Sequence, residues 1–205
     1  MAMAASSWSV PRAWPGATVV CLGGGPSLTQ EDVDRCRGRA RVIAINNAYS
    51  LCAPWGDVLY ACDGAWWTWH QGASSFQGLK VAGEASAGRW PGVRLLTIKG
   101  LHGLEHDSSK LCGGNLSGYQ AINLAVHFGA AKILLLGYDM RLSDSGRAHW
   151  FGHHPNRVVT PYREFLGAFD TLVAPLATLG VEVINITRRT ALTCFPCRSI
   201  EEVLS

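Results

Sequence analysis

The stretch TVVCLGGGPSL, residues 18–28, determines how the rest of the sequence is interpreted. Its first five residues are mostly apolar or β-branched, so they predict a buried strand. Three glycines, Pro26 and Ser27 follow, and they predict a tight turn. Residues 29–36 then predict a helix, because Thr29 is a favourable N-cap and two acidic residues follow it in the first turn. A strand, a glycine turn and a helix in this order are typical of an α/β protein.

The same alternation continues along the chain. Further strands are predicted at residues 41–45, 58–62, 132–136 and 181–186, with weaker candidates at 80–81 and 93–98, and further helices at 117–128 and 162–179. Two polar segments without periodicity, 101–116 and 141–160, are predicted loops. We therefore predict an α/β, Rossmann-like three-layer fold with a mostly parallel central sheet. The 205 residues suit one nucleotide-binding α/β domain, with 1–16 and 190–205 at its periphery.

Composition excludes several classes of protein. Hydrophobic residues make up 48% of the chain and charged residues 16%, which excludes a disordered protein. A net charge of +3 does not indicate a nucleic-acid partner. The sequence has neither a membrane-length apolar run nor a signal-peptide pattern, so we expect no membrane partner and a cytoplasmic location. The seven cysteines are an odd number and lie mostly within apolar runs, so they predict buried free thiols.

The chain also has eight tryptophans, and any that are exposed could mark the interface of a homo-oligomer.

Polar or glycine-rich residues follow each of the best predicted strands. In an open parallel sheet these positions converge on a ligand cleft beyond the carboxyl ends of the strands. Glycines there let backbone N–H groups approach a phosphate, although the spacing matches neither the dinucleotide GxGxxG nor the Walker A motif. The alternative is a tight strand-to-helix turn with no ligand. The residues predicted to bind a nucleotide in this cleft are Gly23, Gly24, Gly25, Ser27, Asn46, Asn47, Asp63, Tyr138 and Asp139.

A second glycine-rich loop precedes the helix predicted at 117–128. It contains Gly114, Asn115, Ser117 and Gly118, which we predict to face the same cleft and to contact the nucleotide. The alternative for Ser117 is an N-cap. Asp63 and Asp139 either bind a cation or ligand hydroxyls, or only cap the turns after their strands.

Histidines and tryptophans supply the remaining candidates. In HWFGHHP, residues 149–155, we expect His153 or His154 to act as a general base, with surface loop histidines as the alternative. Glycine and proline in this run disfavour a helix that would align histidines on a metal, so no metal site is predicted. Trp66, Trp67 and Trp69 cannot all face the core from one helix, so we expect at least one to line a pocket. The tryptophans with no such motif beside them are expected to pack in the core: Trp8, Trp14, Trp55 and Trp90.

Four motifs in order carry a family resemblance: GGGPSL (23–28), INNAY (45–49), SGYQAINLA (117–125) and ILLLGYDM (133–140). They resemble a phage and prophage protein family related to the 6-hydroxymethylpterin diphosphokinase-like domain. The same order of motifs is similar to that of small bacterial sialyltransferases, in a superfamily that includes the central domain of flagellin-modifying motility accessory factors. The resemblance spans residues 17–200.

The resemblance implies a metal-independent, phage-type glycosyltransferase that uses a nucleotide-activated sugar. It implies that Gly23, Gly25 and Ser27 approach the phosphate and ribose, that Asn46 or Asn47 binds the nucleotide or sugar, and that Ser117 and Gly118 contact the base or ribose. His153 or His154 would match the family's catalytic histidine, and Tyr162 a tyrosine that binds the leaving phosphate. The chain lacks the length of the sialyltransferase lid, which disfavours CMP-sialic acid as donor. The acceptor is not identified.

Two alternatives remain at this point. One is a diphosphokinase-like enzyme that transfers pyrophosphate from ATP to a hydroxymethyl group, with Mg²⁺ held by Asp63 or Asp139. The other is a nucleotide-binding protein without catalysis.

Overall fold

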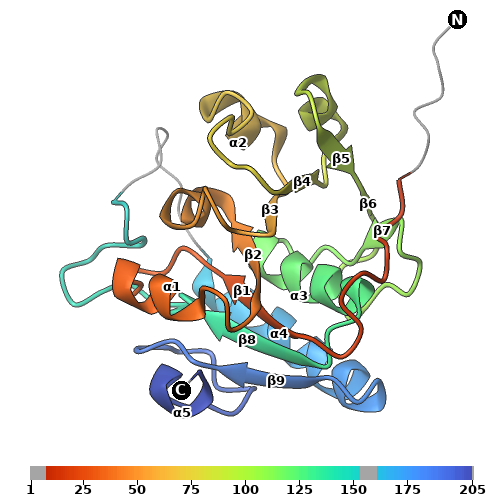
Figure 1. Ribbon diagram of the computed structural model, residues 1–205. Helices are drawn as coiled ribbons and strands as arrows, with labels where there is room; N and C mark the ends of the chain where they lie inside the picture. The colour runs from red at the N-terminus through yellow and green to blue at the C-terminus, as the bar shows by residue number, and fades with distance from the viewer. Residues whose placement is uncertain (1–7, 153–160, 205) are drawn as a thin grey trace, which may run out of the picture.

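A seven-stranded parallel sheet forms the centre of the molecule (Figure 1). The computed structural model describes residues 8–152 and 161–204. The strand order is β5-β4-β3-β2-β1-β8-β9, and each neighbouring pair is parallel. The strands are β1 (Thr18–Leu22), β2 (Arg41–Ile45), β3 (Val58–Ala61), β4 (Leu79–Ala82), β5 (Val93–Leu95), β8 (Lys132–Leu136) and β9 (Glu182–Asn185). A small separate sheet pairs β6 (Thr97–Ile98) with β7 (Lys110–Leu111).

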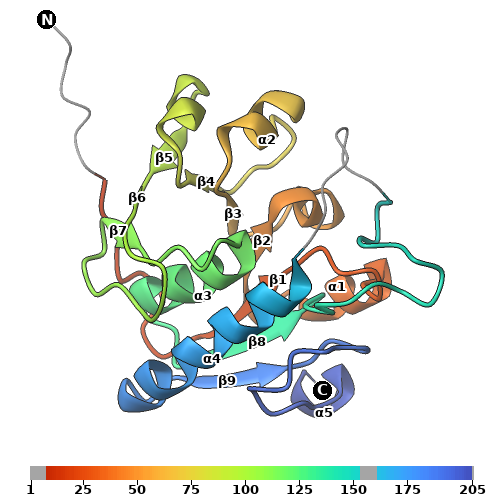
Figure 2. The same ribbon diagram turned by 180° about the vertical axis from the view of Figure 1, so that it is seen from behind.

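Helices cover both faces of the central sheet. On one face lie α1 (Gln30–Cys36), α2 (Gly64–Trp69) and α5 (Ile200–Val203), and on the other lie α3 (Ser117–Phe128) and α4 (Tyr162–Thr178), as Figure 2 shows from behind. Two short 3₁₀ helices, η1 (Asn46–Leu51) and η2 (Ala85–Arg89), follow β2 and β4.

Two hydrophobic cores, one on each face, account for the layers. Strand side chains alternate between faces: Val19 and Cys21 of β1 join the core under α3 and α4, whereas Val20 and Leu22 join the core under α1 and α2. Because both faces are covered, the strands carry continuous apolar runs instead of alternating with polar residues. The predicted α/β three-layer fold with a mostly parallel sheet is confirmed.

Local differences from the prediction occur where the sequence signal is short. The predicted strand 93–98 divides into β5 and β6, and the segment 101–116, predicted as loop, contains β7. The C-terminal tail contains α5, whose start is a capping box between Ser199 and Glu202. Two-residue strands and one-turn helices are below the length at which periodicity can be detected.

All seven cysteines are free thiols, but burial was predicted correctly only in part: Cys62 and Cys194 are half-buried and Cys197 is exposed. In the ranges 8–152 and 161–204, no helix has both the length and the apolar character needed to cross a membrane.

Candidate functional site

The order of strands reverses at β1. The chain runs outward from β1 through β2 to β5 and later returns with β8 and β9 on the other side of β1. The connections leave β1 and β8 toward opposite faces of the sheet, so a crevice opens at their carboxyl ends. Such crevices are where open α/β sheets bind ligands.

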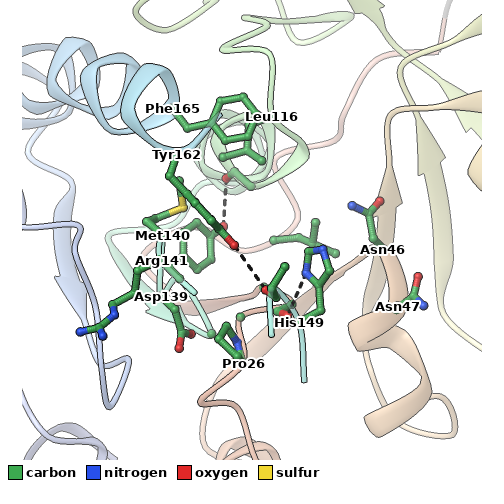
Figure 3. A pocket seen from close by; sticks show the side chains of 18 of the residues that line it. Pro26, Asn46, Asn47, Leu116, Asp139, Met140, Arg141, His149, Tyr162 and Phe165 are labelled. Atoms are coloured by element: carbon green, nitrogen blue, oxygen red, sulfur yellow. Dashed lines mark hydrogen bonds between the residues drawn. The ribbon is translucent and has the colours of Figure 1, made fainter. Parts of the chain in front are cut away.

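A pocket of about 110 Å³ occupies this crevice, and we call it the glycine-loop pocket (Figure 3). It is formed by the turns after β1, β2 and β8, by the starts of α3 and α4, and by residues 148–151. Its lining is Gly23, Gly24, Gly25, Pro26, Ile45, Asn46, Asn47, Leu116, Gly118, Gly137, Tyr138, Asp139, Met140, Arg141, Ala148, His149, Phe151, Tyr162 and Phe165. The pocket therefore contains most of the residues that the sequence predicted.

The glycine turn is held by the protein itself. The N–H of Gly23 donates to Leu136 O at 2.7 Å, and the N–H of Gly25 donates to Gly137 O at 2.8 Å. The N–H of Ser27 donates to Asp139 Oδ1 at 2.8 Å. These three N–H groups are therefore engaged within the chain, and the prediction that this turn approaches a phosphate rests on its other groups.

The glycines serve a close approach between β1 and the turn after β8. A Cβ on Gly23 would lie 2.6 Å from Gly137 O, and one on Gly25 would lie 1.9 Å from Asp139 Oδ2. A Cβ on Gly24 would meet only ordinary contacts, the nearest 3.7 Å away at His149. Gly23 and Gly25 are thus required by packing within the chain.

Two buried oxygens in the pocket lack a hydrogen-bond partner within the described residues: Asn46 Oδ1 and Asp139 Oδ2. Asp139 is only 2% exposed, and burial raises the pKa of its carboxyl above the usual value. Asn46 has a left-handed backbone, φ 51°, which fixes its side chain at the end of β2. Buried polar atoms are normally satisfied, so these two acceptors suit a ligand that brings hydroxyl or amino donors.

Asn47 and Tyr138 are each held by a hydrogen bond within the protein. Trp66 donates its Nε1–H to Asn47 Oδ1 at 2.8 Å. Tyr138 is buried and donates its hydroxyl to Gly118 O at 2.9 Å, linking the turn after β8 to α3. Burial raises the pKa of Tyr138 well above its usual value, so its hydroxyl stays protonated. Tyr138 therefore shapes the pocket wall and has no hydroxyl proton left to donate to a ligand.

The second glycine loop lines a separate and larger pocket. This second pocket, about 1030 Å³, is bounded by the carboxyl ends of β3 and β4, by β5 and β6, and by the start of α3. Asp63, Asn115 and Ser117 line it, not the glycine-loop pocket, while Gly118 lines the first and Leu116 lines both. The prediction that all these residues face one cleft is therefore wrong: they line two neighbouring pockets with Leu116 between them.

The identities of Gly114 and Ser117 in this loop are explained by contacts within the protein. Gly114 has φ 57°, and a Cβ there would lie 2.2 Å from the Tyr119 ring, so no other residue fits. Ser117 is the first residue of α3 and its Oγ accepts the Cys62 N–H at 3.4 Å, whereas the N-cap is Leu116. The alternative that Ser117 is the N-cap is therefore wrong.

Among the histidines, His149 lines the glycine-loop pocket, while the predicted His153 and His154 lie outside the described residues. His149 Nδ1 is 3.3 Å from Gly24 O, and its ring stacks on Phe151 with centroids 4.9 Å apart. Figure 3 shows Tyr162 extending from the start of α4 toward this segment, where its hydroxyl makes a long, 3.5 Å hydrogen bond to Ala148 O. The sequence contained the signal for His149, because it begins the same histidine run.

The tryptophans divide differently from the prediction. Trp66 and Trp67 are buried in the core under α2, and Trp69 is 39% exposed, so they do not all face inward. None of the three is among the described residues lining the two pockets, so the expectation that one lines a pocket is not met at either of them. Trp8, which we assigned to packing, lines the second pocket instead.

Within 8–152 and 161–204, no group of three or more His, Cys, Asp and Glu side chains is arranged to hold a metal ion. Asp63 and Asp139 line different pockets.

The fold has a counterpart among solved structures. The chain is similar in fold to a sialyltransferase. The similar structure is that of sialyltransferase CstII from Campylobacter jejuni in complex with a substrate analogue, cytidine-5'-monophosphate, and the TM-score is 0.54. The match covers 89% of this chain and 85% of CstII at 12% sequence identity. No protein-family model and no curated protein matches the sequence.

Proposed function

We propose that this protein is a glycosyltransferase that binds a nucleotide-activated sugar in the glycine-loop pocket and transfers the sugar to an acceptor hydroxyl. The observation that carries the proposal is the position of that pocket. It lies at the switch point of a sheet whose fold is similar to a sialyltransferase over 89% of the chain, and it contains two unsatisfied buried acceptors. The motif resemblance alone supports a phage or prophage source, and a cytoplasmic location stays a prediction from the sequence.

His149 is the best-placed general base among the described residues. Gly24 O can only accept a hydrogen bond, so Nδ1 of His149 donates to it and Nε2 keeps the lone pair of the neutral ring. That nitrogen can take the proton of an acceptor hydroxyl. His153 and His154, four and five residues further along the chain, remain alternatives for the same role.

The leaving phosphate needs positive or hydrogen-bonding groups. Arg141 and Tyr162 both line the glycine-loop pocket, on the side formed by the turn after β8 and the start of α4. The guanidinium of Arg141 supplies positive charge, which a metal ion provides in other enzymes, and the phenol of Tyr162 can donate a hydrogen bond; together they support a metal-independent mechanism. The phosphate is thus assigned to these side chains, because the N–H groups of Gly23 and Gly25 are occupied.

Ligand-dependent thermal stability tests the donor site. Binding of CMP, UDP, GDP or ADP at 100 times its Kd stabilises the folded protein by about 2.7 kcal/mol, which raises the melting temperature measurably. If none of these nucleotides, with or without a sugar, shifts the transition, the proposal fails.

Release of sugar from the nucleotide that binds tests the chemistry. We expect His149→Ala to reduce turnover by about 10²–10⁴-fold while nucleotide binding is retained. His153→Ala and His154→Ala serve as the comparison set. Turnover is expected to survive EDTA, whereas Mg²⁺-dependent conversion of ATP to AMP would instead identify a diphosphokinase-like enzyme. Nucleotide binding without turnover of any donor would favour a binding protein.

A further inference from the structure

A third pocket adjoins the glycine-loop pocket, and Pro26, Asp139 and Arg141 line both of them. It measures about 410 Å³, and Figure 3 shows Asp139 and Arg141 on the side of the glycine-loop pocket away from Asn46. We call it the arginine pocket after the side chains that line it: Arg141, Arg147, Arg188 and Arg189. They belong to the loop at 141–147 and to the turn after β9, so guanidinium groups reach this space from two separate parts of the chain.

Arg188 is anchored at the wall of the arginine pocket by a buried carboxylate. Its Nε and Nη2 donate to Asp32 Oδ2 and Oδ1 at 3.0 and 2.6 Å. The Asp32 side chain is only 1% exposed, whereas that of Arg188 is 48% exposed. The pair therefore fixes the guanidinium in place, and Nη1, which takes no part in the pair, is left for another acceptor.

Arg141 and Arg189 share a single carboxylate. Arg141 Nη2 donates to Asp144 Oδ1 at 3.3 Å, and Arg189 Nη1 donates to Asp144 Oδ2 at 2.5 Å. One carboxylate neutralises one guanidinium, so this group of three keeps a positive charge. Asp144 is 70% exposed, and solvent weakens both of its ion pairs.

Arg147 forms no ion pair with a carboxylate in residues 8–152 and 161–204. Its backbone is fixed by Ser143: the Arg147 N–H donates to Ser143 Oγ, and the Ser143 N–H donates to Arg147 O, both at 2.9 Å. The closed loop therefore holds Arg147 at the pocket with its charge uncompensated by these residues.

The arginine pocket has an excess of positive charge. Against its four guanidinium groups stand three carboxylates: Asp139 and Asp144 in the lining, and Asp32 behind Arg188. Burial raises the pKa of Asp139, which favours the neutral carboxyl and moves the balance further toward positive. The pocket therefore suits an anion.

The arrangement suits a phosphate better than a carboxylate. A single guanidinium binds both oxygens of a carboxylate in one plane. A phosphate group has three terminal oxygens in different directions, so it can accept from guanidinium groups that belong to two parts of the chain. A volume of about 410 Å³ also leaves room for part of the molecule that carries the phosphate.

Arg147 also lies close to the proposed general base. It is two residues before His149, so their Cα atoms are at most about 7 Å apart. His149 lines the glycine-loop pocket, and Arg147 lines the arginine pocket. A molecule whose phosphate is bound at Arg147 can therefore bring a hydroxyl to His149.

We propose that the arginine pocket binds a phosphate group of the acceptor, so that the sugar is transferred to a phosphorylated molecule. This rests on the proposed function and specifies its acceptor class. The acceptor oxygen bonds to the anomeric carbon, the bond from that carbon to the donor phosphate breaks, and the acceptor proton passes to His149. The leaving phosphate stays at Arg141 and Tyr162. A donor with a second phosphate is the other source of the same chemistry, and competition by nucleotides separates the two.

Calorimetric titration with inorganic phosphate at constant ionic strength tests the site, with chloride as the reference anion. We expect the free protein to bind phosphate saturably. Arg147→Gln with Arg189→Gln removes two positive charges outside the glycine-loop pocket and is expected to weaken phosphate binding about tenfold or more. Both side chains are exposed, so we expect the fold to tolerate the change.

A matched control removes the same charge elsewhere. Arg37→Gln with Arg39→Gln changes two exposed arginines after α1 that line none of the three pockets, and phosphate affinity should be retained. Absence of phosphate binding by the unmodified protein, or an equal effect of the two double variants, overturns the inference.

Saturation with nucleotide then assigns the phosphate to the acceptor or to the donor. The titration is repeated with the nucleotide that binds, as its monophosphate and as its diphosphate. Retained phosphate binding in both cases supports an acceptor site, whereas displacement by either nucleotide assigns the arginine pocket to the donor and overturns the acceptor class. If no nucleotide binds, the proposed function fails and the acceptor class fails with it; nucleotide binding without phosphate binding refutes the acceptor class alone.

Discussion

Replacing Gly25 with alanine separates a structural role of the glycine turn from a ligand-binding role. The new Cβ would lie 1.9 Å from Asp139 Oδ2 and 2.7 Å from Gly137 O, both well inside van der Waals contact. The backbone carbonyl cannot move without disturbing the turn after β8, and displacing the carboxylate breaks its 2.8 Å bond to the Ser27 N–H.

The expected cost follows from these contacts. Overpacking a close contact costs about 1–3 kcal/mol, and losing a hydrogen bond adds about 1 kcal/mol. We therefore expect Gly25→Ala to lower the free energy of unfolding by about 3 kcal/mol, or the melting temperature by roughly 6–12 °C for a chain of this length.

Urea unfolding followed by circular dichroism measures the change, with Gly24→Ala as the matched control. Its Cβ would be 3.7 Å from the nearest side-chain atom, so we expect a change within about 0.5 kcal/mol. If Gly25→Ala were as stable as the parent, or if both variants were equally damaging, the packing explanation of the glycine turn would be wrong.

Three further substitutions test the surroundings of the site by unfolding measurements. Burial raises the pKa of the Asp139 carboxyl, so this carboxyl contributes most to stability below its unfolded pKa, and the contribution falls as pH rises through the folded pKa. Asp139→Asn should remove this loss, so the stability of the variant relative to the parent should grow between the two pKa values. If it does not grow, the raised pKa of Asp139 is contradicted. Tyr138→Phe leaves Gly118 O without its donor and is expected to cost about 1 kcal/mol, with a neutral result arguing against the bond. Burial opposes ionisation of Asp32, but the hydrogen bonds from Arg188 and Thr29 and the charge of Arg188 together outweigh it, so the pKa is lowered. Arg188→Gln should cost about 1–2 kcal/mol at pH 7 and less as pH falls through the folded pKa of that carboxyl, and an equal cost at every pH would refute the ion pair.

The sequence predicted the sheet well because its strands are buried on both faces. Thr18–Leu22 and Lys132–Leu136 are continuous apolar runs that end in glycine or polar turns, and their bounds match the structure. α3 was equally well defined, since Gly129 ends it in a left-handed conformation, φ 98°. These signals depend only on neighbouring residues, so they can be detected in a single sequence.

The chemistry of the site was less predictable because it depends on contacts between distant residues. The glycines after β1 looked like phosphate ligands, and only their pairing with Gly137 and Asp139 identifies them as packing glycines. The split into two pockets follows from how α3 begins beside β3, which no motif encodes. His149 was passed over in favour of His153 and His154 because distance along the chain does not indicate which histidine enters the crevice.

The close contact of Gly23 and Gly25 with Gly137 and Asp139 affects how relatives of this protein are recognised. Gly23 and Gly25 are dictated by the neighbouring main chain and by Asp139, irrespective of what the pocket holds. A search with GGGPSL followed by GYD is therefore expected to gather proteins that build the same crevice, whatever ligand each of them binds. Sorting them by ligand will require residues that this packing does not constrain.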